Sequence, residues 1–275
     1  MIESHAPAKI NLTLRVLGRR PDGFHDIETL IVPLTLSDRL TIEAAPDWAF
    51  SCDDSTLPID EGNLVVRAAR LFFAETGVKP AARIHLEKSI PHGAGLAGGS
   101  SDAATSLRLL DQFFGTDLSN EKLLAMAAQL GSDVPVFING GSAWCRGRGE
   151  IIEPTPFPVR LPILLLKPPF GVPTPWAYRH WKDSRPLAGV LYAPQPFSWG
   201  ILENHLERPV FEKYLLLPAM KQWLLAQPET AGALMSGSGS TMFAVLRDAT
   251  VAAALAARAR EMFGQHIWTL ETVAG

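Results

Sequence analysis

The clearest hydrophobic pattern near the start of the chain is an alternation over residues 8–17. Apolar side chains occupy every second position, and polar residues, beginning with Lys9 and Asn11, fill the positions between them. A period of two predicts a half-buried β-strand, because successive side chains of a strand point to opposite faces. The polar face of this strand is unusual in carrying a lysine and an asparagine at its start.

Helical patterns follow, in which apolar residues recur every three to four positions. Asn63 is a typical N-cap and Gly77 a typical C-terminal glycine, so they bound the first helix, and Gly115 ends the second in the same way. Helices are expected over residues 63–76, 102–114, 119–130, 201–213, 218–227 and 250–263. Strands are expected over residues 8–17, 27–32, 38–43, 83–86, 142–146, 161–166, 241–246 and 266–270.

The order of these elements favours an α+β fold, because strands and helices mix without the regular alternation of a doubly wound sheet. The chain has 275 residues, of which 47% are hydrophobic, enough for one large or two small cores. Glycine and proline are frequent over residues 147–158, which makes this segment the best candidate for a domain boundary. We expect one domain over residues 1–155 and a second over residues 156–275.

Composition and charge exclude several classes of protein. Charged residues make up 19% of the chain without long like-charge runs, which argues against intrinsic disorder. The net charge of −3 provides no basic field, so neither nucleic acid nor membrane is an expected partner, and no obligate protein partner is apparent. Cys52 and Cys145 lack metal-ligand spacing, and neither a signal peptide nor a membrane-spanning run is evident. We therefore expect a protein of the reducing cytoplasm.

A glycine-rich stretch holds the strongest chemical signal. Its residues are Pro91, His92, Gly93, Ala94, Gly95, Leu96, Ala97, Gly98, Gly99, Ser100 and Ser101. Glycine lacks a Cβ atom, so the backbone can adopt positive φ and lie close against a ligand. The serines and Asp102 introduce a helical pattern, which predicts a helix capped by one of these side chains. Free amide groups at a helix N-terminus form an anion site, and phosphate is the natural ligand.

Other interpretations compete with a phosphate site. A flexible turn before a helix is the simplest of them. Residues 93–98 match the dinucleotide pattern GxGxxG of nicotinamide-dependent dehydrogenases, but a second helical pattern follows where that motif needs a strand. A P-loop needs lysine where Gly99 stands. We therefore interpret the stretch as a phosphate-binding loop of a third kind.

The stretch resembles the ATP-phosphate motif of the GHMP small-molecule kinase superfamily, which includes galactokinase, homoserine kinase, mevalonate kinase and phosphomevalonate kinase. The matching pattern is Pro-x-Gly-x-Gly-Leu-x-Gly-Gly-Ser-Ser over residues 91–101. The resemblance implies a two-domain α+β fold with an ATP-binding N-terminal domain, a C-terminal domain and the active site between them. It also implies that ATP is the co-substrate and that Mg²⁺ arrives with the nucleotide.

Further motifs indicate one branch of this superfamily. Residues 7–14 read Pro-Ala-Lys-Ile-Asn-Leu-Thr-Leu, and residues 18–25 read Gly-Arg-Arg-Pro-Asp-Gly-Phe-His. With residues 131–137 and 235–239, they resemble kinases that act on a cytidine-diphosphate-linked sugar alcohol in the non-mevalonate isoprenoid pathway. The reaction implied is phosphoryl transfer from ATP to the 2-hydroxyl of the methylerythritol chain. A kinase for homoserine or a mevalonate derivative and a catalytically silent nucleotide-binding protein stay as alternatives.

The resemblance implies two catalytic residues. Asp133 is the candidate general base, because a carboxylate near the acceptor hydroxyl can take its proton. Lys9 is the candidate partner, because a lysine would keep that carboxylate ionised and stabilise charge on the transferring oxygens. From the residues alone, Asp133 is equally well an N-cap for a short helix starting near Pro135, and Lys9 a solvated lysine at a strand end.

The resemblance also implies a substrate site. Asn11 is expected to position the substrate and His25 to contact cytosine, while Phe24 and Tyr178 are expected to stack on the two faces of the base. Phe24 stands where the family often has tyrosine, so the ring is retained and the hydroxyl is lost. A strand-edge amide, a surface histidine and packing aromatics are the structural alternatives.

The serines that end the glycine-rich stretch are expected to touch phosphate or Mg²⁺, with simple helix capping as the alternative. The small-residue loop at residues 237–239 is expected to support the phosphates, with a simple turn before a strand as the alternative. No cluster of histidine and cysteine exists, so no structural metal is expected.

Overall fold

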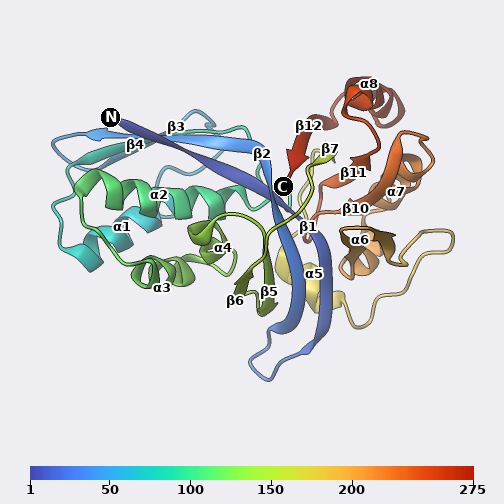
Figure 1. Ribbon diagram of the computed structural model, residues 1–275, viewed down its shortest axis with the longest axis horizontal. Helices are drawn as coiled ribbons and strands as arrows, with labels where there is room; N and C mark the ends of the chain where they lie inside the picture. Colours follow the sequence, from blue (N-terminus) through green and yellow to red (C-terminus); the bar gives the residue numbers. More distant parts are fainter. The chain divides into compact units, whose positions relative to one another are not determined.

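The computed structural model describes residues 1–275, which form two compact units (Figure 1). Unit 1 comprises residues 1–8, 36–91 and 97–141, and unit 2 comprises residues 9–35, 92–96 and 142–275. The units are interleaved along the chain, because two long strands and the glycine-rich stretch each contribute residues to both. These strands are β1 (Ile2–Arg19) and β2 (His25–Ala44). The expected division at residue 155 stays a prediction.

In unit 1, helices pack against a small sheet, as Figure 1 shows for α1, α2 and β4. The elements of this unit are β3 (Ala49–Cys52), α1 (Leu64–Thr76), β4 (Ala82–Glu87), α2 (Gly98–Phe114), α3 (Asn120–Leu130) and α4 (Val134–Asn139). Strand β4 pairs antiparallel with the end of β2 and parallel with β3. The core between them is apolar and includes the fully buried Phe72, whose ring lies 6.2 Å from that of Phe114.

The helix ends of unit 1 test the capping predictions. The Asn63 side chain accepts a hydrogen bond from the Val65 N–H at 3.0 Å, and Gly77 has a φ of 69°, which confirms both ends of α1. Helix α2 begins at Gly98 rather than at residue 102, after Ala97 in the left-handed region and without a side-chain cap. The predicted serine or aspartate cap is therefore wrong, because these residues lie within the first helical turn.

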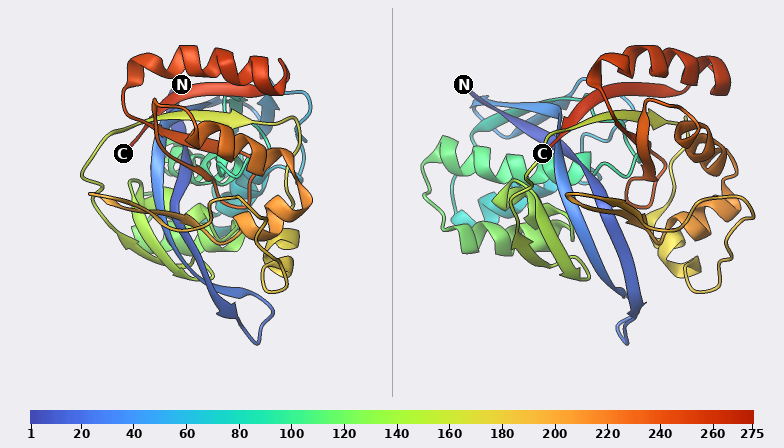
Figure 2. Two further views of the ribbon diagram at one scale, coloured as in Figure 1. Left: turned by 90° about the vertical axis from the view of Figure 1, so that its right-hand side faces the viewer. Right: turned by 45° about the vertical axis from the view of Figure 1, so that its right-hand side comes forward.

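Unit 2 contains a mixed sheet in the order β10-β11-β7-β12-β2-β1-β9-β8, with β5 beside β2 and β6 beside β5. Its strands are β5 (Ala143–Gly147), β6 (Ile151–Pro154), β7 (Leu161–Lys167), β8 (Gln195–Phe197), β9 (Gly200–Asn204), β10 (Thr230–Met235), β11 (Met242–Leu246) and β12 (Trp268–Ala274). Its helices are α5 (Thr174–His180), α6 (Glu207–Lys213), α7 (Leu216–Leu225) and α8 (Ala252–Phe263). Helix α8 lies over β12 and β7 (Figure 2).

The α+β class is confirmed, and several local predictions need correction. Residues 201–213 form strand β9 and then helix α6, not one helix. Tertiary pairing overrides the helical pattern, because β9 pairs parallel with β1 at Thr13 and Glu203. The two strands expected over residues 27–43 are the single strand β2. Elements β3, β6, β8, β10 and α5 were not predicted. No helix has the length and apolarity needed to cross a membrane.

A buried ion cluster in unit 1 ties the segment after β4 to the first turn of α2. Lys88 donates hydrogen bonds to Asp38 and, at 2.9 Å, to Asp102. Asp38 also accepts the N–H groups of Ser89 and Ile90, at 2.6 and 2.8 Å. The two aspartates are 0% and 2% exposed, so one lysine charge faces two buried carboxyl groups.

The second carboxyl group has no countercharge of its own. Burial, together with Asp38, raises the pKa of Asp102 to about 8, against the opposing effect of Lys88. Because the ordinary value is 3.8, the folded protein retains a proton at Asp102 that the unfolded chain has released. The stability due to this proton is therefore complete below about pH 4 and is lost as the pH rises toward about 8.

We predict that Asp102→Asn flattens the pH dependence of stability, because asparagine imitates the protonated carboxyl group at every pH. The free energy of unfolding of the parent should fall between about pH 4 and pH 8 more steeply than that of the variant. Urea titrations across this range measure the difference, with Asp47→Asn as the control at an exposed carboxyl group. Equal slopes for the parent and Asp102→Asn would contradict the prediction.

Candidate active site

Lys9 lies within β1 in unit 2 and is 4% exposed. Its Nζ donates hydrogen bonds to Asn11 Oδ1 at 2.6 Å and to the Gly95 carbonyl at 3.0 Å, and its backbone N–H donates to the Leu96 carbonyl at 3.1 Å. The solvated strand-end alternative is therefore wrong. Lys9 is a buried lysine that is bound directly to the glycine-rich stretch.

Asn11 is oriented by a chain of hydrogen bonds that sequence analysis did not find. Its Nδ2 donates to the Thr29 hydroxyl at 2.7 Å, and that hydroxyl donates to the Thr13 carbonyl at 2.7 Å. Because the amide nitrogen is directed at Thr29, the amide oxygen is directed at Lys9. Asn11 and Thr29 are 3% and 2% exposed. Thr29 lies in a predicted strand, where a threonine is ordinary, so the sequence carries no signal for this role.

The part of the glycine-rich stretch in unit 2, residues 92–96, is fixed through its carbonyl groups. The Ala94 carbonyl accepts the Thr241 N–H at 3.1 Å, and the Gly95 carbonyl accepts the Ser236 hydroxyl at 3.0 Å in addition to Lys9. Gly95 has a φ of +77°, and a Cβ atom there would lie 2.3 Å from the Ser236 carbonyl oxygen. Only glycine fits at this close approach of two loops.

The N–H groups of the stretch are oriented differently from its carbonyls. None of the N–H groups from His92 to Ser100 donates a hydrogen bond within the protein. Those of Gly98, Gly99 and Ser100 belong to the first turn of α2, in unit 1, whose N-terminus carries no side-chain cap. Free donors at the positive end of a helix dipole form an anion site.

The Ser101 side chain, in the same helical turn, also indicates a ligand site. Its hydroxyl is fully buried and has no hydrogen-bond partner. A hydroxyl oxygen is a hard donor that suits Mg²⁺ or a phosphate oxygen. No group of three or more acidic, histidine or cysteine side chains is placed to hold a metal ion.

Asp133 lies in unit 1 and immediately precedes α4. Its backbone is in the right-handed helical region, and its side chain makes no capping hydrogen bond. The N-cap alternative is therefore wrong as an account of this carboxylate. Because Lys9 belongs to unit 2, the pairing of Lys9 with Asp133 stays a prediction.

The residues predicted for the base lie in unit 2. The His25 ring is 5.5 Å from that of Tyr178 and 6.3 Å from that of Trp181. Phe24 is 52% exposed, and the Arg148 guanidinium lies 4.9 Å from the centre of its ring. Phe24 does not fill a core, and Arg148 is a neighbour that the sequence did not suggest. The stacking of a base between Phe24 and Tyr178 stays a prediction.

His25 has an altered proton affinity. Partial burial, and then the charge of Arg19, lowers the pKa of the His25 imidazole. A neutral imidazole has one donor and one acceptor nitrogen, either of which can bond a polar group of a ligand.

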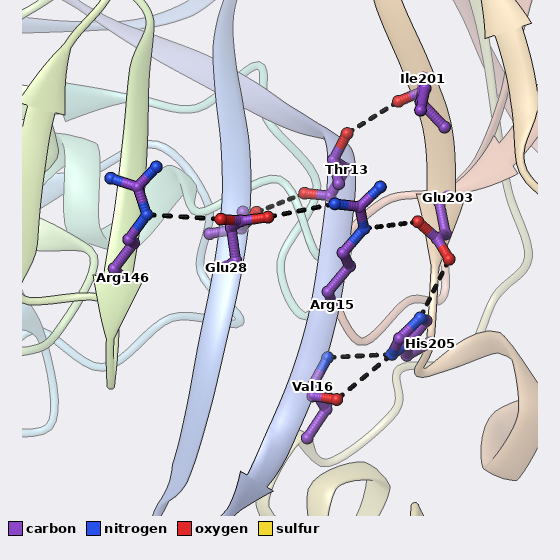
Figure 3. Close-up of polar contacts among 9 residues, drawn as sticks. Thr13, Arg15, Val16, Glu28, Arg146, Ile201, Glu203 and His205 are labelled. Atoms are coloured by element: carbon purple, nitrogen blue, oxygen red, sulfur yellow. Dashed lines mark hydrogen bonds and ion pairs between the residues drawn. The ribbon is translucent and has the colours of Figure 1, made fainter.

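A network of charged side chains fixes β1 to its neighbours in unit 2 (Figure 3). Arg15 binds Glu203 at 2.7 Å and Glu28 at 3.2 Å. Glu28 also binds Arg146, and His205 binds Glu203. Burial would raise the pKa of Glu203, but hydrogen bonds from Arg15 and His205 outweigh it and lower that pKa. The pairs join β1, β2, β5 and β9 along the strand that carries Lys9.

Comparison with known proteins identifies the family. The model of the GHMP kinase N-terminal domain matches residues 63–141, and that of the GHMP kinase C-terminal domain matches residues 194–265. A 4-diphosphocytidyl-2-C-methyl-D-erythritol kinase of Methylacidiphilum infernorum is 45% identical over 247 residues, which cover 89% of this chain and 86% of the relative. This chain belongs to the 4-diphosphocytidyl-2-C-methyl-D-erythritol kinase family.

Further relatives agree with this assignment. A 4-diphosphocytidyl-2-C-methyl-D-erythritol kinase of Pelotomaculum thermopropionicum is 40% identical over 94% of both chains. A crystal structure of 4-(cytidine 5'-diphospho)-2C-methyl-D-erythritol kinase has a TM-score of 0.82, 36% identity and full coverage of both chains. A homoserine kinase of Cytophaga hutchinsonii, with a TM-score of 0.69 and 18% identity, shares the fold. The chain is therefore a small-molecule kinase, with ATP as co-substrate.

We predict that Thr29→Val lowers kcat by about ten-fold or more, because small displacements of a positioned group are costly in rate. Valine has the shape of threonine but leaves the Asn11 amide free to turn away from Lys9. Thr29→Ser keeps the hydroxyl and should retain most of the activity. Steady-state kinetics and melting temperatures of both variants measure the effect, and a normal kcat for Thr29→Val would show that the hydroxyl has no role in orienting Lys9.

Proposed function

We propose that this chain transfers the γ-phosphoryl group of ATP to the 2-hydroxyl of 4-diphosphocytidyl-2-C-methyl-D-erythritol, a step in isoprenoid precursor synthesis. The single observation that supports this chemistry is that the N–H groups from His92 to Ser100 make no hydrogen bond within the protein, whereas the carbonyls of residues 94–96 are hydrogen-bonded. The identity of the acceptor rests on the relatives, which bear the name of a kinase for this alcohol.

Phosphoryl transfer needs positioning and charge stabilisation more than covalent chemistry. In the proposed mechanism the free N–H groups hold ATP phosphates, and Lys9 stabilises charge on the transferring oxygens. Asp133 accepts the proton of the attacking hydroxyl, so the new O–P bond forms as the β–γ bridge to ADP breaks. The absence of a capping bond at Asp133 supports this role, because the carboxylate is not committed to α4.

Mg²⁺ belongs to the same proposal. Bound with the nucleotide, it would neutralise phosphate charge. Ser101 would supply a protein oxygen to it or to a phosphate, since its buried hydroxyl has no other partner. Ser100 is proposed as a second hydroxyl of the same helical turn.

The cytidine base is proposed to bind at the aromatic residues of unit 2. His25 would read the polar edge of the base, and the exposed ring of Phe24 offers a stacking face. Arg148 already lies over that ring, so it would either share Phe24 with the base or bind the diphosphate beside it.

The proposed function is tested by coupled measurement of ADP release. 4-Diphosphocytidyl-2-C-methyl-D-erythritol should support turnover, while homoserine and mevalonate should not. Turnover with either of the latter and none with the cytidyl alcohol would overturn the proposed substrate.

We predict that Asp133→Asn lowers kcat by about 10²–10⁴-fold, the usual contribution of a general base. Asparagine keeps the shape but cannot accept the proton. The Kd for ATP, measured by calorimetry, should change little because the phosphate site is made of backbone groups. Asp183→Asn, at an exposed aspartate, is the control. A near-normal kcat in Asp133→Asn would remove Asp133 from the mechanism.

We predict that Phe24→Ala raises KM for the cytidyl substrate by about ten-fold, because aromatic stacking on a base contributes about 1–3 kcal/mol. KM for ATP should stay unchanged, and Phe24→Tyr should be close to neutral because the stacking face is preserved. Varying each substrate in turn separates the two constants. An equal rise in both KM values would show that Phe24 does not bind the base.

A further inference from the structure

Strand β10 lies at one edge of the sheet of unit 2, where its only partner strand is β11. An edge strand has backbone groups without a neighbouring strand, and these need other partners when they are buried. Residues 233–235 of this strand are fully or almost fully buried.

Side chains take the place of the missing strand. Gln195 bonds both backbone groups of Ala233: its Nε2 donates to the carbonyl at 2.9 Å, and its Oε1 accepts the N–H at 3.1 Å. Two residues further along, Met235 is bonded in the same way by two side chains. The Glu207 carboxylate accepts the Met235 N–H at 3.0 Å, and Asn204 Nδ2 donates to the Met235 carbonyl at 2.7 Å.

Asn204 reaches beyond the strand into the following loop. Its Nδ2 also donates to the Gly237 carbonyl at 2.8 Å, and its Oδ1 accepts the Leu206 N–H at 2.9 Å. Asn204 is 5% exposed, and all three bonds are directed at backbone groups. The Oδ1 atom of Asn204 is therefore fixed by the Leu206 N–H at the start of α6, while its Nδ2 atom holds the loop at the Gly237 carbonyl.

Glu207 is fixed by a buried ion pair. Lys221 Nζ donates to Glu207 Oε2 at 2.5 Å and to the Leu191 carbonyl at 2.7 Å. Both charged residues are 1% exposed. The second oxygen of Glu207 is the one that accepts the Met235 N–H.

The loop held in this way, residues 236–239, contacts the candidate active site. The Ser236 hydroxyl bonds the Gly95 carbonyl, as described above. A Cβ atom on Gly237 would lie 3.3 Å from Lys9 Nζ and 3.4 Å from Asn11 Oδ1. A displacement of this loop would therefore move Gly95 and Lys9 together.

We propose that Asn204 and Glu207 are positioning residues of the phosphoryl-transfer site, which hold loop 236–239 against Gly95 and Lys9. This inference rests on the proposed function. Neither side chain touches a substrate in it, since both act through the backbone of Met235 and Gly237. Gln195 makes equivalent bonds to the same strand edge, and its side-chain hydrogen bonds go to Ala233 rather than to the loop, so it supplies a matched control.

The first experiment compares Asn204→Ala with Gln195→Ala. Both variants should lose stability, because each leaves buried backbone groups without partners. Only Asn204→Ala should lower kcat, by about ten- to hundred-fold, and weaken ATP binding, while KM for the cytidyl substrate stays within about two-fold. Equal kcat losses in the two variants, or a normal kcat in Asn204→Ala, would overturn the proposal. If Asn204→Ala does not fold, Asn204→Ser, with its single donor, is measured instead.

The second experiment isolates Glu207 from its ion pair. In a Lys221→Met background, Glu207→Gln keeps an oxygen for the Met235 N–H, whereas Glu207→Leu does not. The glutamine variant should have the higher kcat by about ten-fold, and the melting temperature of each reports stability separately. Equal kcat values would show that the bond to Met235 has no role in positioning.

Measurements on the parent protein distinguish failure of the proposed function from failure of the positioning role. A parent that does not turn over the cytidyl alcohol contradicts the proposed function, and the variants are then compared by their Kd for ATP alone. A parent that is active, with variants that keep its kcat and ATP affinity, leaves the proposed function standing and refutes the positioning role.

Discussion

The contact between Gly95 and Ser236 is the constraint on which the candidate site depends. A Cβ atom at residue 95 would lie 2.3 Å from the Ser236 carbonyl oxygen, so the two loops can meet only through glycine. The contact places the Gly95 carbonyl where both Lys9 and Ser236 donate to it. With its carbonyls bound, the stretch leaves its N–H groups for an anion. The proposed phosphate site therefore depends on the way the backbone is fixed rather than on any single charged side chain.

Polar side chains around this backbone orient one another. Lys9 is directed by Asn11, which is directed by Thr29, and loop 236–239 is held by Asn204 and Glu207. Each of these bonds is buried, and a buried polar group that loses its partner is costly. A site assembled from such groups has little freedom to rearrange, which suits a reaction whose main requirement is the placement of phosphates and an acceptor hydroxyl.

In unit 1, a buried cluster of charged side chains fixes the backbone around the start of α2. Lys88 lies between Asp38 and Asp102, so the segment before the glycine-rich stretch and the first turn of α2 are held by one cation. The surplus carboxyl group keeps its proton to about pH 8, because burial disfavours its charge. The helix N-terminus beside it therefore stays free of a fixed negative charge, which favours an anionic ligand.

The sequence alone determined the local features whose causes are local. The cap of α1 by Asn63, its end at Gly77, the alternation of β1 and the glycine pattern of the phosphate motif all follow from residues a few positions apart. It also indicated the superfamily, because several motifs occur in order along the chain. Only the tertiary structure decided that residues 200–204 form a strand, since pairing with β1 outweighs their helical pattern. Only the fold brings Thr29, Arg148, Asn204 and Glu207 to the site, because hydrogen bonds between distant segments leave no periodic trace in a sequence.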